Sequence, residues 1–470
     1  MSILERPGAA AVADAMGALT DLLGVDRVFT GADVLAQHAH DESFHPEARP
    51  DAVVWPRSTE EAAAIVRVAA AHRLPLVPFG AGTSLEGHVA ALAGGISVDM
   101  REMNAIGAPS LDDLDVHVQA GVSRRQLDAR LRPEGVFFSV DPGADATIGG
   151  MIATGASGTT TVRYGAMREN VLSITVVDGQ GRVVRTHTRA RKSSAGYDLT
   201  RLMIGSEGTL GLICEAILRV HPIPEAVAAA QCTFPSLEDA VRCVIRVGQH
   251  AIPVTRIELV DERSMTALNS HFETAFEIAP TLFVEFEGAS RTEVETLARE
   301  TAAIAAEFGG SEFRWATDER ERRRLWHARH GAMEAVLATR PGSGALTTDV
   351  CVPVSALAEC IRETQADIAE HDLPSAIVGH VGDGNFHALI LVDPDDPADI
   401  ARGEAFHDRL VRRALAHDGT CSGEHGVGYG KARFLVDEHG VAGVEMMRAI
   451  KHALDPDGIF NPGKGAAAAD

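Results

Sequence analysis

The sequence has little cysteine, and its cysteines are not spaced for binding a metal cluster. The six cysteines among the 470 residues include no Cys-x-x-Cys pair. This argues against an iron–sulfur cluster and against a disulfide framework. The sequence therefore indicates a protein of the reducing cytoplasm, and it leaves peripheral attachment to a membrane open.

Long apolar runs are also absent. No stretch approaches the roughly 18 uninterrupted apolar residues that indicate a transmembrane helix. Near the N-terminus, Glu5, Arg6 and Asp14 interrupt the alanines, so the apolar region of a signal peptide is missing. We expect neither a transmembrane segment nor a cleaved signal.

Basic residues are in the minority: 43 Lys and Arg stand against 66 Asp and Glu, for a formal net charge of −23. A nucleic-acid binder is not expected, because its affinity depends on neutralising phosphates. An anionic substrate would need a locally positive pocket. The length of 470 residues exceeds that of one typical core, and it predicts two domains or one large composite.

Strand-like segments outnumber the helices between them in the first half of the chain. The run from Ser58 to Glu61 is a capping box that opens a helix to His72. Strands are expected at residues 76–79, 96–99, 115–119, 173–177, 182–185 and 212–220. The intervening helices are too few for regular β-α-β alternation, so an α+β fold is favoured over a doubly wound sheet.

A proline-bearing segment from His221 to Glu225 predicts a domain boundary. Beyond it, strands expected at 230–234 and 282–287 alternate with helices expected at 237–249 and 292–308. We therefore expect one domain at residues 1–224 and a second at 225–425. A C-terminal segment at 426–470 would return to the first domain.

Glycine is concentrated in a few loops of the first half. The loop from Pro78 to Gly87 leaves a strand, and it has neither the G-x-G-x-x-G spacing of a Rossmann turn nor the end of a P-loop. Further glycine clusters lie at 141–165 and 205–211. Any one of them could be a tight turn of a β-rich domain. Several in one domain indicate a nucleotide-type ligand, without identifying it, because glycine lets backbone N–H groups converge on an anion.

The run from His380 to His387 predicts a metal site. Asp383-Gly384 lies between apolar, strand-like flanks, which is typical of a hairpin, and a turn centred there places His380 opposite His387. Two imidazoles so placed can chelate a divalent metal, and Glu424 and His425 in a later glycine loop could add a carboxylate and a base. The alternative is a pair of packed or solvent-facing histidines. Glu424 and His425 can serve one site only from an irregular turn, because neighbours in a strand point to opposite faces.

Residues 318–339 are expected to form one helix with an apolar stripe, and Arg329 lies on that stripe. An arginine on a buried face needs an anionic partner. Two partners are open at this point: a substrate carboxylate and an internal acidic residue.

The order of these motifs resembles the vanillyl-alcohol oxidase superfamily of flavoproteins, and within it the FAD-linked oxidases that act on D-2-hydroxy acids. The resemblance runs from about Pro50 to Lys464, and its most specific blocks are residues 78–87, 379–387, 419–430 and 461–464. It implies an FAD-binding domain of the vanillyl-alcohol oxidase type at 1–224 and a second α+β domain for substrate and metal. By this resemblance, FAD is held by the following residues: Pro78, Gly80, Ala81, Gly82, Thr83, Ser84, Gly87, Pro142, Gly143, Ala144, Thr147, Gly149, Gly150, Ala153, Thr154, Ser157, Gly158, Tyr164, Gly211 and Asn461.

The resemblance also implies roles at the second site. His380, His387 and Glu424 match the ligands of a divalent metal, zinc or manganese, and His425 matches the base. Arg329, in the segment from Leu325 to His330, matches the residue that binds the substrate carboxylate.

Residues 338–342 and 348–353 are similar to those of D-lactate dehydrogenases that pass electrons to cytochrome c. The chain departs from the 2-hydroxyglutarate dehydrogenases, because Leu389 stands where they have asparagine and Thr347 where they have lysine. Both differences favour a substrate with a small or apolar side chain.

We therefore interpret the chain as an FAD- and metal-dependent D-2-hydroxyacid dehydrogenase, with D-lactate as the first substrate to test. A separate acceptor, namely a cytochrome, a quinone or an electron-transfer flavoprotein, would take the electrons, and a homodimer is left open. The alternatives are oxidation of D-2-hydroxyglutarate or glycolate, a non-redox FAD transferase similar to alkyl-dihydroxyacetonephosphate synthase, and a flavin-free metallohydrolase.

Overall fold

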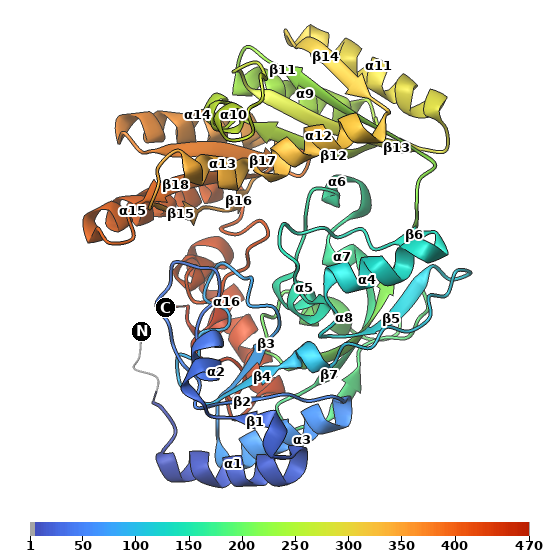
Figure 1. Cartoon of the computed structure of the whole chain (residues 1–470). Coiled ribbons are helices and arrows are strands. Elements are labelled where there is room, and N and C mark those ends of the chain that lie inside the picture. Colours follow the sequence, from blue (N-terminus) through green and yellow to red (C-terminus); the bar gives the residue numbers. More distant parts are fainter. Residues whose placement is uncertain (1–4, 470) are drawn as a thin grey trace. The chain divides into compact units, whose positions relative to one another are not determined.

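The computed structural model describes residues 5–469, apart from the side chains of Glu312 and Ala328. The chain is an α+β protein, as predicted, and it divides into two compact units (Figure 1). The first unit contains residues 1–157, 165–223 and 424–470, and the second contains residues 158–164 and 224–423. No helix in the described part of the chain is both long enough and apolar enough to cross a membrane.

The division differs from the expected domains in three places. The first boundary falls after Ile223, one residue before the expected position, and the last boundary falls before Glu424 instead of after His425. In addition, residues 158–164 belong to the second unit. The reason is that this short segment includes helix α6 (Thr161–Tyr164), which packs against strand β12 (Val254–Val260), a contact between segments that lie far apart in the sequence.

The described residues of the first unit form two four-stranded sheets and one short strand pair. One sheet has the order β1 (Val28–Phe29), β2 (Ala52–Val54), β4 (Ile96–Asp99), β3 (Leu76–Phe79), with β2, β4 and β3 parallel. The other is antiparallel, in the order β5 (Asp115–Gln119), β9 (Leu212–Arg219), β7 (Val171–Val177), β8 (Val183–Arg185). Strands β6 (Val136–Phe137) and β10 (His221–Pro222) form the pair.

The described α-helices of this unit are α1 (Ala9–Leu23), α2 (Ala32–Gln37), α3 (Thr59–His72), α4 (Arg124–Leu131), α5 (Ile148–Thr154), α7 (Met167–Asn170), α8 (Leu199–Met203) and α16 (Leu435–Leu454). Ser58 caps α3 as predicted, since its Oγ accepts the N–H of Glu61 at 3.2 Å. The Glu61 carboxylate accepts from the N–H of Arg57, not from that of Ser58, so the reciprocal half of the expected capping box was wrong.

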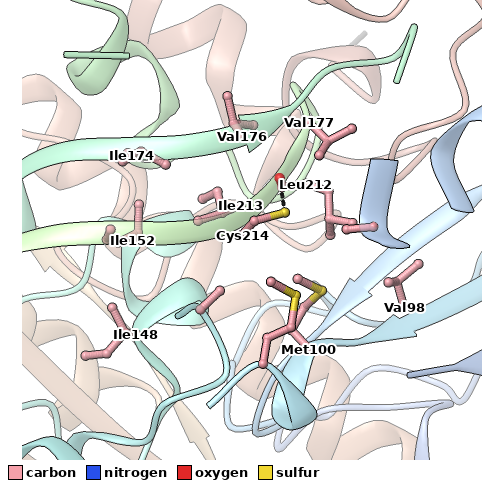
Figure 2. Close-up of a cluster of buried hydrophobic side chains, with 14 of the residues drawn as sticks. Val98, Met100, Ile148, Ile152, Ile174, Val176, Val177, Leu212, Ile213 and Cys214 are labelled. Atoms are coloured by element: carbon pink, nitrogen blue, oxygen red, sulfur yellow. Dashed lines mark hydrogen bonds between the residues drawn. The ribbon is translucent and has the colours of Figure 1, made fainter. Parts of the chain in front are cut away.

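The core of the first unit draws on strands from both sheets. Figure 2 shows side chains of β7 and β9 gathered with residues of α5, β4 and the turn after β4: Val98, Met100, Ile148, Ile152, Ile174, Val176, Val177, Leu212, Ile213 and Cys214. The end of the chain joins the same core, because Ile459 and Phe460 are buried in it. The backbone of Leu76 is hydrogen-bonded to Ile459 and Asn461 at 2.7 and 2.8 Å, so this segment lies along β3.

The second unit is built on one antiparallel sheet. Its order is β14 (Ser311–Ala316), β11 (Ala226–Thr233), β13 (Thr281–Gly288), β12, β17 (Ser375–His380), β18 (Asn385–Val392), β15 (Gly344–Thr347), and β16 (Val350–Cys351) also pairs with β18. One helical layer is formed by α10 (Glu262–His271), α12 (Glu319–His330) and α13 (Ala332–Ala338). A second layer is formed by α9 (Leu237–Gln249), α11 (Arg291–Glu307), α14 (Val354–Glu370) and α15 (Pro397–Ala416) (Figure 1).

The helix expected at 318–339 is two helices, so that prediction was wrong at its centre. Gly331 separates α12 from α13, and glycine is the least favourable residue for a helix after proline. A side chain at this position would also collide with Phe272, since a Cβ on Gly331 would lie 2.3 Å from the ring. The break lets α13 pack on α10, while α12 contacts β11, β13 and β14.

Candidate active site

The hairpin that carries His380 and His387 has a register different from the one expected. His380 lies opposite Asn385, and His387 lies opposite Val378, so the expected pairing of the two histidines was wrong by two residues. An even shift leaves each side chain on its original face of the sheet. The two rings consequently still lie together, with their centroids 5.5 Å apart.

The turn explains this register. The sequence predicted a two-residue turn at Asp383 and Gly384. In the usual type I′ form of such a turn, φ is positive at both residues, but of these two only Gly384 has a positive φ, at 82°. Residues 381–384 instead form a longer loop. It is closed by the N–H of Asp383, which donates to the carbonyl of His380 at 3.0 Å.

Both rings are oriented through their Nδ1 atoms. His380 Nδ1 lies 2.7 Å from Oε1 of Glu258, and His387 Nδ1 lies 2.9 Å from the carbonyl of Thr348. Carboxylate and carbonyl oxygens only accept hydrogen bonds, so Nδ1 of each ring carries a proton, and in the neutral form of each ring Nε2 is the nitrogen with a lone pair. Metal-ligating histidines are usually held in this way. The pair therefore fits a divalent metal.

Glu258, on β12, also accepts a hydrogen bond from Nη2 of Arg329 at 2.5 Å. Glu258 is 1% exposed and Arg329 is 8% exposed. Burial opposes ionisation of Glu258, but His380 and Arg329 outweigh it and hold the pKa of the carboxyl below its usual value. The internal ion pair that the sequence left open for Arg329 is thus present. Arg329 Nε has no acceptor among the described residues, so it remains a donor for an anion.

The segment that precedes Glu424 is fixed by Asp349. This buried carboxylate accepts from Asn385 Nδ2 at 2.8 Å and from Ser422 Oγ at 2.9 Å. Gly423 follows directly, and a Cβ there would lie 2.1 Å from Asn385 Nδ2. A larger residue here would displace the Asn385 side chain that donates to Asp349.

Glu424 and His425 begin the last segment of the first unit, so the predicted metal and base residues are divided between the two units. Glu424 Oε2 accepts a hydrogen bond from Ser157 Oγ at 2.8 Å. The backbone here is irregular, as predicted, with positive φ at Gly426 and Gly428.

The loop that follows His425 is tied to Glu207. The Glu207 carboxylate accepts the backbone N–H groups of Val427 and Gly428 at 2.6 and 2.8 Å. Burial of this carboxyl is outweighed by the neighbouring His88 and by these two hydrogen bonds, so the pKa of Glu207 lies below its usual value. Glu207 belongs to the last glycine cluster, at 205–211.

The glycine loops of the first unit approach one another closely. A Cβ on Gly80 would lie 2.3 Å from Oγ1 of Thr147, and one on Gly149 would lie 2.7 Å from Cβ of Ala120. By contrast, a Cβ on Gly143 meets nothing within 4 Å. A side chain at Gly80 or Gly149 would have to displace one of these neighbours. We call this pair of close approaches the cradle, and the absence of side chains there fits a cofactor bound by backbone groups.

The loop at 80–88 is shaped by Asp41. Its carboxylate accepts from Ser84 Oγ and from the N–H of His88, both at 2.8 Å. Thr147, another predicted cofactor residue, caps α5 by accepting the N–H of Gly150 at 3.3 Å. These hydroxyl groups thus help to hold the loops in shape.

Two more predicted cofactor residues are engaged with protein groups. Asn461 Nδ2 donates to the carbonyl of Glu207 at 2.8 Å. Tyr164 donates its hydroxyl to Glu287 at 2.5 Å, within the second unit. Gly211 approaches strand β7, where its Cβ would lie 2.7 Å from a backbone oxygen. Of the expected set, Gly158 and Tyr164 lie in the second unit and the other residues lie in the first.

A buried lysine completes this part of the first unit. Lys464 Nζ donates to the carbonyl of His88 at 2.7 Å and to Oδ1 of Asn461 at 2.6 Å. Burial lowers the pKa of Lys464 to about 7, against the opposing effect of nearby carboxylates. Unlike an exposed lysine, Lys464 is therefore only partly protonated near pH 7 in the folded protein.

Sequence reasoning missed four carboxylates that organise these sites: Asp41, Glu207, Glu258 and Asp349. Glu258 had a weak signal, because it is an acid in an otherwise largely apolar strand-like run from Val254 to Val260. Asp41 lies in a polar segment, where an acidic residue is ordinary. Glu207 and Asp349 lie in the segments 205–211 and 348–353, but no role was predicted for either carboxylate.

Comparisons with known proteins agree with this architecture. The family model "FAD linked oxidases, C-terminal domain" matches residues 223–465, and the model "FAD binding domain" matches residues 50–187. The chain is 46% identical to "Probable D-lactate dehydrogenase, mitochondrial" of Danio rerio, over 97% of this chain and 92% of that protein. It is 44% identical to the mitochondrial "D-lactate dehydrogenase [cytochrome]" of Arabidopsis thaliana, over 90% of this chain and 74% of that protein.

Among solved structures, 4-ethylphenol oxidase from Gulosibacter chungangensis has a TM-score of 0.81 at 18% identity, covering 99% of both chains. This likeness shows a shared fold. The family matches confirm the resemblance that the motifs indicated. The chain belongs to the FAD linked oxidases.

Proposed function

We propose that this oxidoreductase converts D-lactate, or a D-2-hydroxy acid of similar size, to the 2-oxo acid and passes the electrons to a separate acceptor. The observation that carries the proposal is a hydrogen-bonded row beside His387, in which buried Arg329 and buried Glu258 are followed by half-buried His380. It combines a donor for a carboxylate with two oriented imidazoles. The names of the two relatives support D-lactate as the first substrate.

We propose FAD as the redox cofactor, held by the loops at 78–87 and 142–158. The cradle at Gly80 and Gly149 supports this assignment, as does the match to the FAD-binding model. When bound, FAD supplies the acceptor for the hydride that leaves Cα of the substrate.

We propose His380, His387 and Glu424 as ligands of a divalent metal, zinc or manganese. Support comes from the Nδ1 hydrogen bonds, which leave Nε2 of each ring as the coordinating atom. When bound, the metal supplies Lewis acidity that favours loss of the substrate's hydroxyl proton.

The remaining roles belong to side chains of the chain itself. Arg329 binds the substrate carboxylate through donors that Glu258 does not occupy. His425 accepts the hydroxyl proton as the general base. The proton thus goes to His425, while the Cα–H electron pair leaves as hydride.

The surroundings of Leu389 support a small substrate. Leu389 lies opposite Thr347 on strands β18 and β15, and it belongs to the apolar cluster under α12 and α13. A second carboxylate placed there would be desolvated without a cationic partner at either position. This disfavours 2-hydroxyglutarate.

The test is the absorption spectrum of the purified protein under anaerobic conditions, recorded while D-lactate and then L-lactate are added. Rapid bleaching of the flavin by the D enantiomer alone is expected. A yellow protein that D-lactate does not bleach, but D-2-hydroxyglutarate or glycolate does, would overturn the substrate. A yellow protein bleached by no hydroxy acid would indicate a non-redox transferase, and a colourless protein would argue against FAD. Cytochrome c would be the first acceptor tested, since the Arabidopsis relative is named for a cytochrome.

A further inference from the structure

We propose that Glu258 is a positioning residue that orients the metal ligand His380 and the substrate-binding Arg329 at the same time. This inference rests on the proposed function, because it concerns how those two side chains are held for it. Glu258 itself would touch neither the metal nor the substrate.

The strand register places Glu258 directly beside His380. On β12 and β17, Val260 pairs with Val378 and Leu259 pairs with Gly379. Continuing this antiparallel register by one residue puts Glu258 opposite His380, where side chains share one face of the sheet. The 2.7 Å hydrogen bond between them is therefore a cross-strand contact built into a rigid sheet.

The two oxygens of Glu258 serve two different partners. Oε1 accepts from His380 Nδ1, and Oε2 accepts from Arg329 Nη2. A carboxylate that is 1% exposed needs such partners, because an unpaired buried charge is costly. Both partners are donors, and each approaches a different oxygen. A glutamine in this place would turn its NH2 group, which only donates, toward one of them.

Each hydrogen bond has a separate consequence. The bond to His380 selects the tautomer with the proton on Nδ1, which leaves the Nε2 lone pair for the metal. The bond to Arg329 holds one end of the guanidinium, and Nε stays without an acceptor among the described residues. Metal affinity and substrate affinity should therefore both depend on a residue that contacts neither.

The sharpest test is Glu258→Gln, which keeps the shape but replaces one accepting oxygen by a donor. Glu285→Gln is the matched control. Glu285 is a buried carboxylate on the adjacent strand β13, and its ion-pair partner is Arg256, at 3.3 Å. The FAD-loaded proteins would be compared by equilibrium dialysis against Mn²⁺ and against Zn²⁺, and by steady-state kinetics with D-lactate.

We expect Glu258→Gln to weaken metal binding roughly 10- to 100-fold, as for other partners of metal-bound histidines, and to raise KM for D-lactate. Saturating metal should restore most of kcat and leave KM high, a split that a general loss of stability would not produce. Glu285→Gln should leave the metal Kd and KM near the wild-type values. His380→Ala should abolish metal binding at this site.

Wild-type metal affinity and KM in a folded Glu258→Gln would overturn the inference while leaving the proposed function standing. A wild-type protein that D-lactate does not reduce would instead overturn the proposed function. If Glu258→Gln does not fold, Glu258→Asp carries the test, because its shorter side chain keeps the charge but cannot reach both partners. Unchanged metal affinity and KM in that variant would count against the inference equally.

Discussion

Ser157 donates a hydrogen bond from Oγ to Oε2 of Glu424 at 2.8 Å, across 267 positions of the chain. The sequence predicted that Ser157 would bind FAD, and that stays a prediction; in the structure its hydroxyl donates to a proposed metal ligand. Hydrogen bonds to charged groups contribute about 1.5–3 kcal/mol. Ser157→Ala should therefore raise the metal Kd roughly tenfold and leave the flavin content unchanged, as measured by dialysis and by absorbance.

Ser110→Ala is the control for that experiment, because Ser110 also donates to a carboxylate in the same unit, that of Asp113 at 3.0 Å. It should change neither quantity. If Ser157→Ala loses flavin but binds the metal normally, the Ser157 hydroxyl serves FAD binding and does not orient a metal ligand.

Gly80→Ala should reduce the FAD content of the purified protein. Its Cβ would lie 2.3 Å from Oγ1 of Thr147, so this side chain, which caps α5, would have to move; relieving such overpacking typically costs about 1–3 kcal/mol. Gly17→Ala in α1, where a Cβ also has open space and no FAD contact is proposed, should bind FAD as the wild type does. Equal flavin content in both variants would argue against the proposed cradle.

His425→Asn should lower kcat by about 10²- to 10⁴-fold, the usual contribution of a general base, while FAD remains bound. Single-turnover flavin reduction by D-lactate would measure the chemical step directly. His452→Asn, an exposed histidine on α16 of the same unit, is the control. Normal flavin reduction in His425→Asn would remove the base assignment.

Arg329→Met should raise KM for D-lactate and also destabilise the fold. Removing one partner of a buried ion pair typically costs about 3–5 kcal/mol, because the other charge is left uncompensated. Arg256→Met removes the partner of Glu285, so it should lower stability without changing KM. Thermal melting and kinetics on both variants would separate the effects, and an equal rise of KM in the two would contradict a direct role for Arg329.

Lys464 should make stability depend on pH. Its pKa is about 7 in the folded protein, and that of lysine in an unfolded chain is about 10.4. Between these values the unfolded chain binds a proton that the folded protein does not, so the free energy of unfolding should rise with pH from about 7 to about 10. Below pH 7 Lys464 is protonated in both states, and the free energy of unfolding is lowered by the full cost of burying its charge.

The measurement is urea unfolding of wild type and Lys464→Met at several pH values across this range. The rise should be smaller in the variant, which has no proton to gain at this position. Parallel curves for the two proteins would show that Lys464 does not titrate as described.

Helix and strand bounds were predictable where they depend on neighbouring residues alone. Strands β3, β4 and β5 have the bounds expected from apolar runs and turn residues, and Ser58 caps its helix. The hairpin register was not predictable from the Asp383-Gly384 pair alone, because it depends on the φ that Asp383 adopts. The break at Gly331 was not predictable from the local pattern either. Phe272, which is far away in the sequence, packs so closely on position 331 that a side chain there would collide with its ring.

The residue types of the site could be proposed from the sequence, but the network that orients them could not. Glu258 meets Arg329 across 71 positions and His380 across 122 positions. Nothing in the local pattern around Glu258 specifies either partner. Such contacts follow from sheet register and helix placement, which exist only in the folded chain.

The segment from Ile459 to Asn461, which lies along β3 and is buried in the core of the first unit, sets the order in which the protein can mature on the ribosome. Most strands of the first unit are synthesised before the second unit, but the residues that complete their sheet and core emerge only after it. Nearly all of the second unit, residues 224–423, is made in between as one continuous stretch. Domains generally fold as units during synthesis. The first unit, although its synthesis begins first, therefore completes its core after the second unit has been made. A ribosome that stalls shortly before residue 459 leaves that core without Ile459 and Phe460.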